Sequence, residues 1–517
     1  MNLTVADYAR ARRNIHVILA WSVLSSLGAS ITSGALLSLY ITSSLVSGTD
    51  ESVGGVASAA GAAMLLAALP AGALTDRCGR RLAARAGAVA GVLAAAALAA
   101  ALALGGLPLL YAASALGGAA AALSAAPVAA LLADSLPAGG RTRVMTIQYV
   151  ANLAASAGGP LGAMVVFLLC GNAYDGGLIA IILHAGNAIA VAAAMLLLLL
   201  DDAGGGASES LLKQQSGGGG AVNSIAMAAT EADAVAESEL GAQLLPEGAG
   251  VAGVGGGVGG GGRNLGHQTL RLLGVTLTVR AVPYVIFFSD LVLACGAGMT
   301  VQFFSLFFRD DLALSPAAVA GVFAAAPVAI AALSLLALPL NRLLGRALAC
   351  VLLTACGTAA LFALTRAMPA PAAIVLYLVR TASMNASYPT QRAILMDVVA
   401  ANTRGCWSAL ENLTAATWTG SAALGGMLLQ QLGYSTLFVI TGTIYVASLL
   451  MLLPLVPLTA GERVDGGGGS WTAAASKDEG DEGGELVEKV AGLDGGGPAA
   501  GVAQPPLRGE LDDTSGA

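Results

Sequence analysis

Residues 71–81 read AGALTDRCGRR, and this stretch decides the fold because of its position in the chain. It separates two long apolar runs, residues 53–75 and 82–105, and each run reaches the roughly 20 residues that a membrane-spanning helix needs. Glycine allows a tight turn, and arginines are favoured at the anionic inner surface of a membrane. The stretch therefore predicts a short loop between two spanning helices, held at the cytosolic surface.

The composition of the whole chain indicates a membrane protein. Of its 517 residues, 56% are hydrophobic and only 11% are charged, and the mean hydropathy is +0.78. One soluble core cannot bury that much apolar surface, so the chain needs lipid as part of its solvent. Twelve candidate spans recur along it: 15–45, 53–75, 82–105, 107–133, 144–170, 177–200, 281–308, 315–340, 346–366, 371–398, 407–431 and 434–457.

The spans form two groups of six, which predicts an all-α membrane protein with two six-helix bundles. The expected parts are an N-terminal segment (1–14), a first bundle (15–200), a glycine-rich linker (201–280), a second bundle (281–457) and an acidic, glycine-rich tail (458–517). The linker and the tail lack the apolar content that offsets the entropy of ordering a chain, so we expect both to be disordered. Near the end of the linker, residues 270–275 predict either an interfacial helix or an early start of the seventh span.

Arginines are unevenly distributed between the two sets of loops. Loops after even-numbered spans carry Arg77, Arg80, Arg81, Arg141, Arg143, Arg342, Arg346 and Arg404. Loops on the other side carry only Arg309 and Arg366. Because cytosolic loops hold an excess of Lys and Arg, we expect a multi-pass protein with both termini in the cytosol.

The 71–81 stretch resembles the G-x-L-x-D-R-x-G-R-R signature of the major facilitator superfamily, which lies between the second and third helices of that family. The matching residues are Gly72, Asp76, Arg77, Gly79, Arg80 and Arg81. The resemblance covers about residues 15–457 and implies a secondary transporter in which these residues form a gating loop. It also implies that Asp76 contacts the start of the eleventh helix, around Trp407 and Ser408, when the transporter is open outward. The alternative is that the loop only sets the topology.

Two short sequence echoes relate the halves. The stretch NRLLGR at 341–346 is a weak copy of the first-half signature, with asparagine in place of the acid. Asp134 precedes Arg141 by the same spacing as Asp397 precedes Arg404, and each pair follows the fourth span of its half. Two similar halves are typical of transporters in which the bundles rock around a site between them.

Polar side chains inside the spans mark candidate binding residues, because burying an ionisable group there costs at least about 2.5–3.5 kcal/mol. In the family that the sequence resembles, the first, fourth, seventh and tenth helices line the central cavity, which places the seventh and tenth spans beside the substrate path. The candidates for substrate binding on these two spans are Arg380, Asn385, Gln302 and Tyr388.

Arg380 is the most informative of these candidates. It lies about 13 Å from the outer end of its span at about 1.5 Å per residue, too deep to reach water easily. A guanidinium at this depth can hold a carboxylate or phosphate with two parallel hydrogen bonds, which predicts an anionic or zwitterionic substrate. The alternative is that Arg380 pairs with backbone carbonyls or with an acid between helices.

The seventh span adds a carboxylate and a group of aromatic residues. Asp290 is either a proton-coupling site or the partner of Arg392 in a permanent ion pair, and the sequence favours neither. The phenylalanines near the outer end of the span form an outer gate or face lipid; they are Phe303, Phe304, Phe307 and Phe308.

The sequence lacks the patterns of the competing classes. It has neither G-x-x-x-x-G-K-[ST] nor H-E-x-x-H, and its six cysteines lack the spacing of metal ligands or a disulfide framework. We therefore expect no enzyme activity, no cofactor, no metal and no nucleic-acid partner. We expect a monomer in the lipid bilayer that moves a small organic solute by alternating access, with protons as a candidate coupling ion. The alternatives are a non-transporting membrane sensor and a drug or metabolite exporter.

Overall fold

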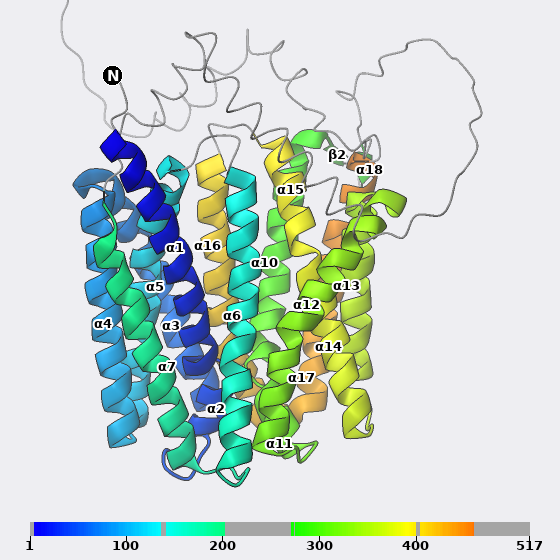
Figure 1. The fold of residues 1–517 in the computed structure, drawn as a ribbon. Coiled ribbons are helices and arrows are strands. Elements are labelled where there is room, and N and C mark those ends of the chain that lie inside the picture. The colour runs from blue at the N-terminus through cyan, green and yellow to red at the C-terminus, as the bar shows by residue number, and fades with distance from the viewer. Residues whose placement is uncertain (1–4, 136–140, 202–269, 273–274, 400–403, 460–517) are drawn as a thin grey trace, which may run out of the picture. The chain divides into compact units, whose positions relative to one another are not determined.

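The computed structural model of this protein describes residues 5–135, 141–201, 270–272, 275–399 and 404–459. The expected disorder of the tail and of most of the linker falls outside these ranges. Figure 1 shows the described helices running side by side between two ends. We call the end that holds the start of α1 (Val5–Thr32) and all of α18 (Leu455–Leu458) the terminal face, and the opposite end the distal face.

The first half contains the first six predicted spans. After α1, its elements are α2 (Ala35–Ile41), α3 (Asp50–Cys78), α4 (Arg80–Leu104), α5 (Leu107–Ser135), α6 (Arg141–Leu169), α7 (Gly176–Leu196) and the 3-10 turn η1 (Leu197–Leu199). The first span is divided at Gly34, whose φ of 69° is a conformation that glycine adopts readily. Each of the six spans falls on a helix, as predicted.

The second half contains the other six spans. Before α18, its elements are α10 (Val282–Val301), α11 (Phe304–Asp310), α12 (Pro316–Leu344), α13 (Arg346–Ala363), α14 (Ala370–Ala386), α15 (Tyr388–Val398), α16 (Arg404–Gly420) and α17 (Ala422–Leu452). Pro389 stands in the first turn of α15 and, lacking an N–H, breaks the tenth span in two. Within α17, Gly433 is non-helical, with a φ of 75°.

Gly433 marks the reversal between the last two spans. Gly298 on α10 packs against Trp418, before Gly433, while Gly296 packs against Ile444, after it. The chain therefore runs toward the distal face and returns, as predicted. By length and composition alone, ten helices among the described residues can cross a membrane, because this measure joins the last two spans and leaves out the divided tenth.

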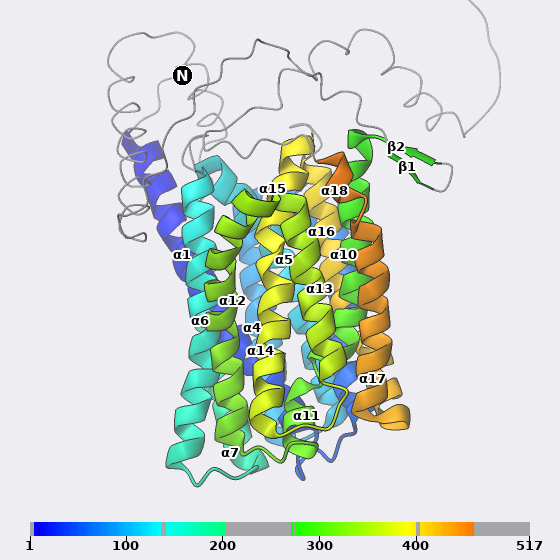
Figure 2. The ribbon, with the colours of Figure 1, turned by 90° about the vertical axis from the view of Figure 1, so that its right-hand side faces the viewer.

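The prediction of a helix at 270–275 is wrong. This region forms an antiparallel hairpin of β1 (Leu270–Leu272) and β2 (Val275–Leu277), in which Leu270 pairs with Leu277. Figure 2 shows it beside the terminal ends of α10 and α18. Valine and threonine follow one another in the second strand, and such β-branched residues favour strands over helices. The 3-10 turn η3 (Val279–Ala281) then leads into α10.

The 71–81 stretch is a turn, but the loop that we predicted is reduced to one residue. Helix α3 continues to Cys78 and α4 begins at Arg80, so Gly79 alone is non-helical, with a φ of 88° and a ψ of 152°. The signature residues that lie in helices and not in a loop are Gly72, Asp76 and Arg77 on α3 and Arg80 and Arg81 on α4. The prediction was wrong because polar residues can extend a helix beyond the apolar span, whereas only the positive φ requires glycine.

The second half repeats this turn. Gly345 joins α12 to α13 with a φ of 86° and a ψ of 150°, within two degrees of the values at Gly79. The sequence echo at 341–346 therefore has the same backbone geometry as the signature in the first half.

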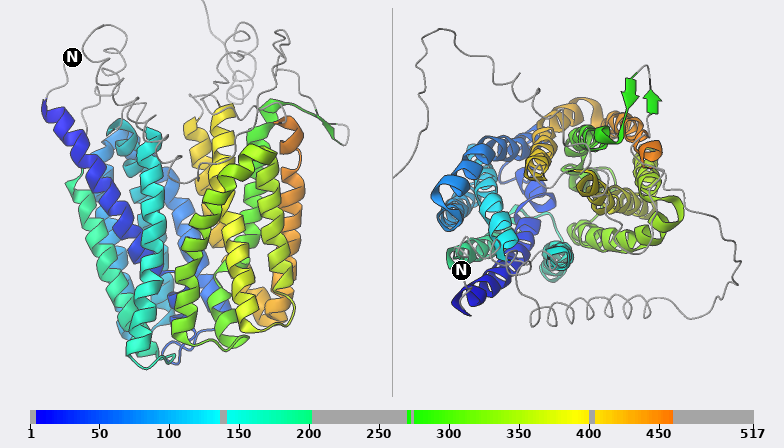
Figure 3. Two further views of the ribbon diagram at one scale, coloured as in Figure 1. Left: turned by 45° about the vertical axis from the view of Figure 1, so that its right-hand side comes forward. Right: turned by 90° about the horizontal axis from the view of Figure 1, so that it is seen from above.

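Figure 3 shows the helices of the two halves as separate groups that diverge toward the terminal face. Toward the distal face they meet, with α3 against α16 and α17, and α6 against α12. The Ser58 hydroxyl donates to the Gly420 carbonyl and accepts from the Ala423 N–H, each at 2.8 Å. Such contacts tie the halves together through helix backbone on one side of the bundle.

The two halves have different cores. In the first half, glycine and alanine let helices approach closely; an added Cβ at Gly118 on α5, for example, would overlap the Ala60 carbonyl of α3. In the second half, a buried aromatic cluster fills the distal end, consisting of Phe303, Phe304, Phe307, Phe308, Tyr377 and Phe438. The phenylalanines of the seventh span are therefore buried, and the lipid-facing alternative is wrong.

Gly118→Ala should lower the melting temperature of the purified protein, because the added methyl meets helix backbone that cannot move aside. Overpacking of this kind costs about 1–3 kcal/mol. Gly117→Ala is the matched control on the same helix, since a Cβ there meets no atom within 4 Å. An equal response of the two variants would show that α3 and α5 do not pack as described.

Candidate functional site

A central cavity of about 760 Å³ lies between the two halves. Its walls include Trp21, Ser25, Ser114 and Ser156 from the first half, and Gln302, Phe323, Tyr377 and Trp418 from the second. Among the residues described, no Asp, Glu, Lys, Arg or His lines it. The cavity therefore offers hydroxyl groups and apolar surface but no charge.

A second cavity of about 440 Å³ lies within the second half, and we call it the arginine pocket. Its polar wall residues include Asp290, Arg380, Asn385, Tyr388, Gln391 and Arg392. Five of the six residues named from the sequence as binding or coupling candidates thus surround one cavity. Three residues line both cavities, Val301, Tyr377 and Trp418, so the arginine pocket adjoins the central cavity.

Arg380 is the most deeply buried of the charged residues in the arginine pocket, with 3% of its surface exposed. Its guanidinium lies over the rings of Phe304 and Tyr445, 5.4 and 5.6 Å from the ring centroids. One terminal nitrogen donates to the Tyr445 hydroxyl. The buried Nε has no hydrogen-bond partner, and no ion pair joins Arg380 to a carboxylate within the described part of the chain. Aromatic faces and one phenol therefore hold the cation.

Tyr445, which positions Arg380, is absent from the residues predicted from the sequence. It belongs to a polar stripe on α17 that also contains Thr441 and Ser448, at helical spacings of four and three. Thr441 bonds to Thr300 of α10, and Ser448 bonds to Ser289 of the same helix. A polar stripe of period 3.5 in an otherwise apolar span was the signal that could have identified it.

The remaining substrate candidates differ in position. The Asn385 amide donates to the Thr381 carbonyl of its own helix at 2.8 Å. Tyr388 is 43% exposed and lies at the break between α14 and α15. Gln302 lies apart from the arginine pocket, at the end of α10, where its carbonyl accepts from the Ser38 hydroxyl at 3.2 Å. Gln302 therefore faces the central cavity, away from the other candidates.

Asp290 and Arg392 reach the arginine pocket from different helices. Asp290 lies midway along α10 and is partly buried, whereas Arg392 lies in the second turn of α15 and is exposed. Both line the cavity wall. With Asp290 ionised, the two arginines leave this wall with one positive charge in excess.

At the terminal face, ion pairs join the ends of helices within each half. Arg81 lies 3.2 Å from Asp201, and Arg346 lies 2.8 Å from Asp397. Each pair thus ties the helix that follows a one-residue turn to another element of its own half. The gating contact implied by the family resemblance falls outside the described side chains, which do not include those of Asp76, Trp407 and Ser408.

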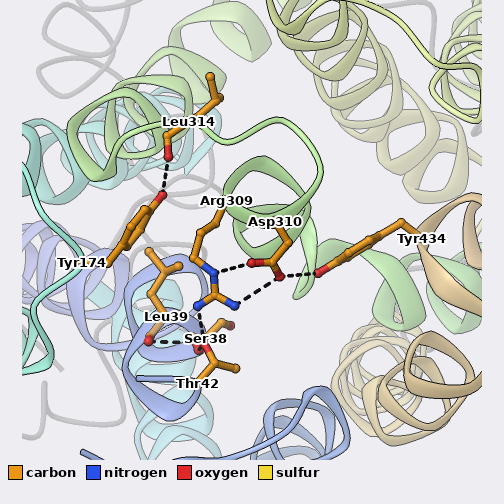
Figure 4. A network of polar contacts seen from close by, with 8 residues as sticks. All are labelled: Ser38, Leu39, Thr42, Tyr174, Arg309, Asp310, Leu314 and Tyr434. Carbon is orange, nitrogen blue, oxygen red and sulfur yellow. Dashed lines mark hydrogen bonds and ion pairs between the residues drawn. The ribbon is translucent and has the colours of Figure 1, made fainter. Parts of the chain in front are cut away.

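At the distal face, a polar network joins the two halves (Figure 4). The Arg309 guanidinium at the end of α11 donates to the Thr42 hydroxyl of the first half at 2.6 Å. It also pairs with the neighbouring Asp310 carboxylate at 2.6 Å. The Tyr434 hydroxyl, near the Gly433 reversal, donates to the same carboxylate at 3.1 Å. The Arg309 and Asp310 side chains thus link Thr42 of the first half to Tyr434 on α17 of the second.

Two more hydrogen bonds cross between the halves beside this network. The Tyr174 hydroxyl donates to the Leu314 carbonyl at 2.7 Å, and the Ala317 N–H donates to the Asn172 side chain at 2.9 Å. Burial raises the pKa of Tyr174 to about 12, although nearby Arg309 lowers it, so the phenol stays protonated at neutral pH. We call this set of contacts, together with the Arg309 network, the distal seal.

Comparison with known proteins agrees with this architecture. The family model described as Major Facilitator Superfamily matches residues 18–423. The fold resembles the xylose transporter XylE from E. coli in a partially occluded inward-open conformation, with a TM-score of 0.58 and 14% identity over 87% of this chain and 100% of that one. It also resembles a bacterial homologue of the iron transporter ferroportin in an inward-facing state, with a TM-score of 0.54 and 12% identity over 86% and 98% of the two chains.

A third structure, the nucleoside transporter NupG, has a TM-score of 0.53 and 15% identity over 85% of this chain and 98% of its own. At these identities the likeness is one of fold. No curated protein sequence matches the chain. The family match spans most of the chain and both halves of the bundle, and the structure supplies the same twelve-span architecture. The chain belongs to the Major Facilitator Superfamily of membrane transporters.

Proposed function

We propose that this protein is a secondary active transporter of a small anionic or zwitterionic organic solute, and that the arginine pocket binds the charged group of that solute. The observation that carries the proposal is Arg380, a buried cation with no carboxylate partner in the described part of the chain. Asn385 and Tyr388 line the same pocket and supply further polar contacts. Gln302 faces the adjoining central cavity, where it is a candidate for contact with the solute on its path.

The energetics of Arg380 favour a bound anion. Removing a cation from water costs several kcal/mol, and two desolvated cation–π contacts return about 2 kcal/mol each. The buried Nε–H remains unpaired, and an unmet donor costs about 1–3 kcal/mol, more for a charged group. A carboxylate that accepts from the guanidinium supplies the missing charge and a charge-assisted hydrogen bond. Arg380 therefore suits a ligand better than it suits a permanent structural role.

The two faces of the bundle support transport by alternating access. The distal seal closes one face, whereas the halves diverge toward the other (Figure 3). With the arginine-rich terminal face in the cytosol, this arrangement is an inward-facing state. Rocking the halves apart at the distal seal opens the central cavity to the outside. A membrane sensor with the same fold binds the solute without moving it, so flux separates the two functions.

Asp290 is the candidate for proton coupling. When Asp290 binds a proton, the charge of the pocket that holds the substrate changes. The affinity of the pocket for the solute then depends on whether the proton is bound, and the affinity for the proton depends on the solute. Arg392, on the same wall, is the counter-charge for the ionised form. This arrangement links proton and solute in one cavity of one half.

Arg380→Gln should reduce the uptake of anions into proteoliposomes at least about tenfold, because each charge-assisted hydrogen bond contributes about 1.5–3 kcal/mol. Uptake of benzoate, lactate, glutamate and the neutral sugar xylose is compared for the wild type and the variant. The exposed loop residue Arg366 provides the matched control, Arg366→Gln. Equal anion uptake by the wild type and Arg380→Gln would exclude Arg380 as a substrate-binding residue. A lowered melting temperature of the variant without ligand would indicate a structural role for Arg380.

Asp290→Asn should abolish solute accumulation driven by an inward pH gradient while leaving exchange of labelled for unlabelled solute intact, because exchange needs no net proton movement. Asp397→Asn, which removes a carboxylate outside the arginine pocket, is the control. Gradient-driven accumulation that persists in Asp290→Asn excludes proton coupling at this residue. Loss of exchange together with a lower melting temperature would instead favour a permanent ion pair with Arg392.

Thr42→Val should loosen the distal seal, since it removes the acceptor for Arg309 but keeps the shape of the side chain. Hydrogen–deuterium exchange should rise in α2 and α11 by about tenfold or more, the amount expected for one hydrogen bond to a charged group. Thr42→Ser keeps the hydroxyl and should exchange like the wild type. If both variants exchange alike, this contact does not hold the halves together.

A further inference from the structure

The arginine pocket is unusually rich in aromatic residues for this chain. Aromatic residues make up 5% of the sequence, yet they supply five of the 21 residues that line the pocket. These five are Phe287, Tyr377, Tyr388, Trp418 and Tyr445. In a protein whose helices pack mainly through alanine and glycine, this concentration gives the pocket large flat apolar surfaces.

Most of the polar groups and most of the apolar groups come to the pocket from different helices. Helices α14 and α15 supply Arg380, Asn385, Gln391 and Arg392, which carry the hydrogen-bonding and cationic groups. Helix α10 supplies one carboxylate, Asp290, and six apolar side chains, which are Ile286, Phe287, Leu293, Ala294, Ala297 and Val301. The pocket therefore fits a ligand with one charged edge and one apolar body.

The charge and the size of the pocket limit the kinds of ligand that fit it. Arg380 has no carboxylate partner in the described part of the chain, so a single negative charge on the ligand balances its charge. A volume of about 440 Å³ lies in the range of sites for small organic ligands. A sugar has hydroxyl groups on every side, and those that face the apolar side chains of α10 would lose their hydrogen bonds to water without replacement.

We propose that the arginine pocket recognises an aromatic monocarboxylate, and this inference rests on the proposed function. The carboxylate accepts from the Arg380 guanidinium, and the ring lies among Phe287, Trp418 and Tyr388. Aromatic rings in offset or edge contact gain about 0.5–1.5 kcal/mol beyond their area burial. The aromatic residues thus select for the ring, and Arg380 selects for the charge.

Three matched ligands separate these two contributions in binding to the purified full-length protein, measured by thermal stabilisation. Benzoate has both ring and charge, benzamide keeps the ring without the charge, and cyclohexanecarboxylate keeps the charge without the aromatic ring. We expect cyclohexanecarboxylate to bind about threefold to tenfold more weakly than benzoate. Benzamide should bind at least about tenfold more weakly than benzoate, and xylose should not stabilise the protein.

Two neighbouring phenylalanines provide a matched pair of variants. Phe287→Leu should weaken benzoate binding but leave cyclohexanecarboxylate nearly unchanged, because Phe287 lines the pocket. Phe288→Leu should change neither, since Phe288 is 49% exposed and lies outside it. If the ratio of benzoate affinity to cyclohexanecarboxylate affinity is the same in Phe287→Leu as in the wild type, the proposed ring contact is wrong.

The outcomes separate this inference from the proposed function. If lactate or glutamate binds as tightly as benzoate and needs Arg380, the aromatic preference is wrong while the anion transporter stands. If only xylose or another neutral solute binds and is transported, both the aromatic preference and the anionic substrate are wrong. Arg380→Lys, which keeps the charge without the planar fork, should retain weak benzoate binding, and its melting temperature without ligand reports whether it folds.

Discussion

The charge of Arg380 in the low-dielectric interior is the constraint on which the second half depends. A cation that far from water must be surrounded by groups that stabilise it, and here those groups come from separate helices: Phe304 of α11 and Tyr445 of α17. The polar stripe that contains Tyr445 also bonds α17 to α10. The aromatic cluster therefore does more than fill space, because it sets the distance and the angle at which three elements meet around one guanidinium.

The first half is built under a different constraint, that of close helix approach. Its wall of the central cavity consists mainly of small side chains and hydroxyls, and its helices meet through glycine and alanine. Small residues allow packing by van der Waals contact and leave no charge to be satisfied. The asymmetry suggests a division of roles in the proposed mechanism: the second half holds the solute, and the first half offers a smooth surface that moves against it.

Much of this arrangement could be predicted from the sequence, because lipid forces long apolar runs to be helices and the runs are easily counted. The same reasoning selected Asp290, Arg380, Asn385, Tyr388 and Arg392, which line one pocket, since polar residues stand out in apolar spans. It could not show that Gln302 lies apart from them, because a helix that ends at Val301 and a break before α11 change the direction of that side chain. Phe287 and Trp418 carry no polar group that distinguishes them from packing residues, so only the folded chain shows that they surround the same pocket.

The glycine turns at 79 and 345 determine how the bundle can deform. A connection of one residue has no slack, so α3 and α4 cannot slide past one another, and neither can α12 and α13. We therefore expect each pair of helices to move as one rigid piece. The distal connections after α6 and α11 are several residues long, so they can change conformation when the helices move. In the transport cycle proposed above, the two halves would thus separate and meet again as bodies in which these two helix pairs stay intact.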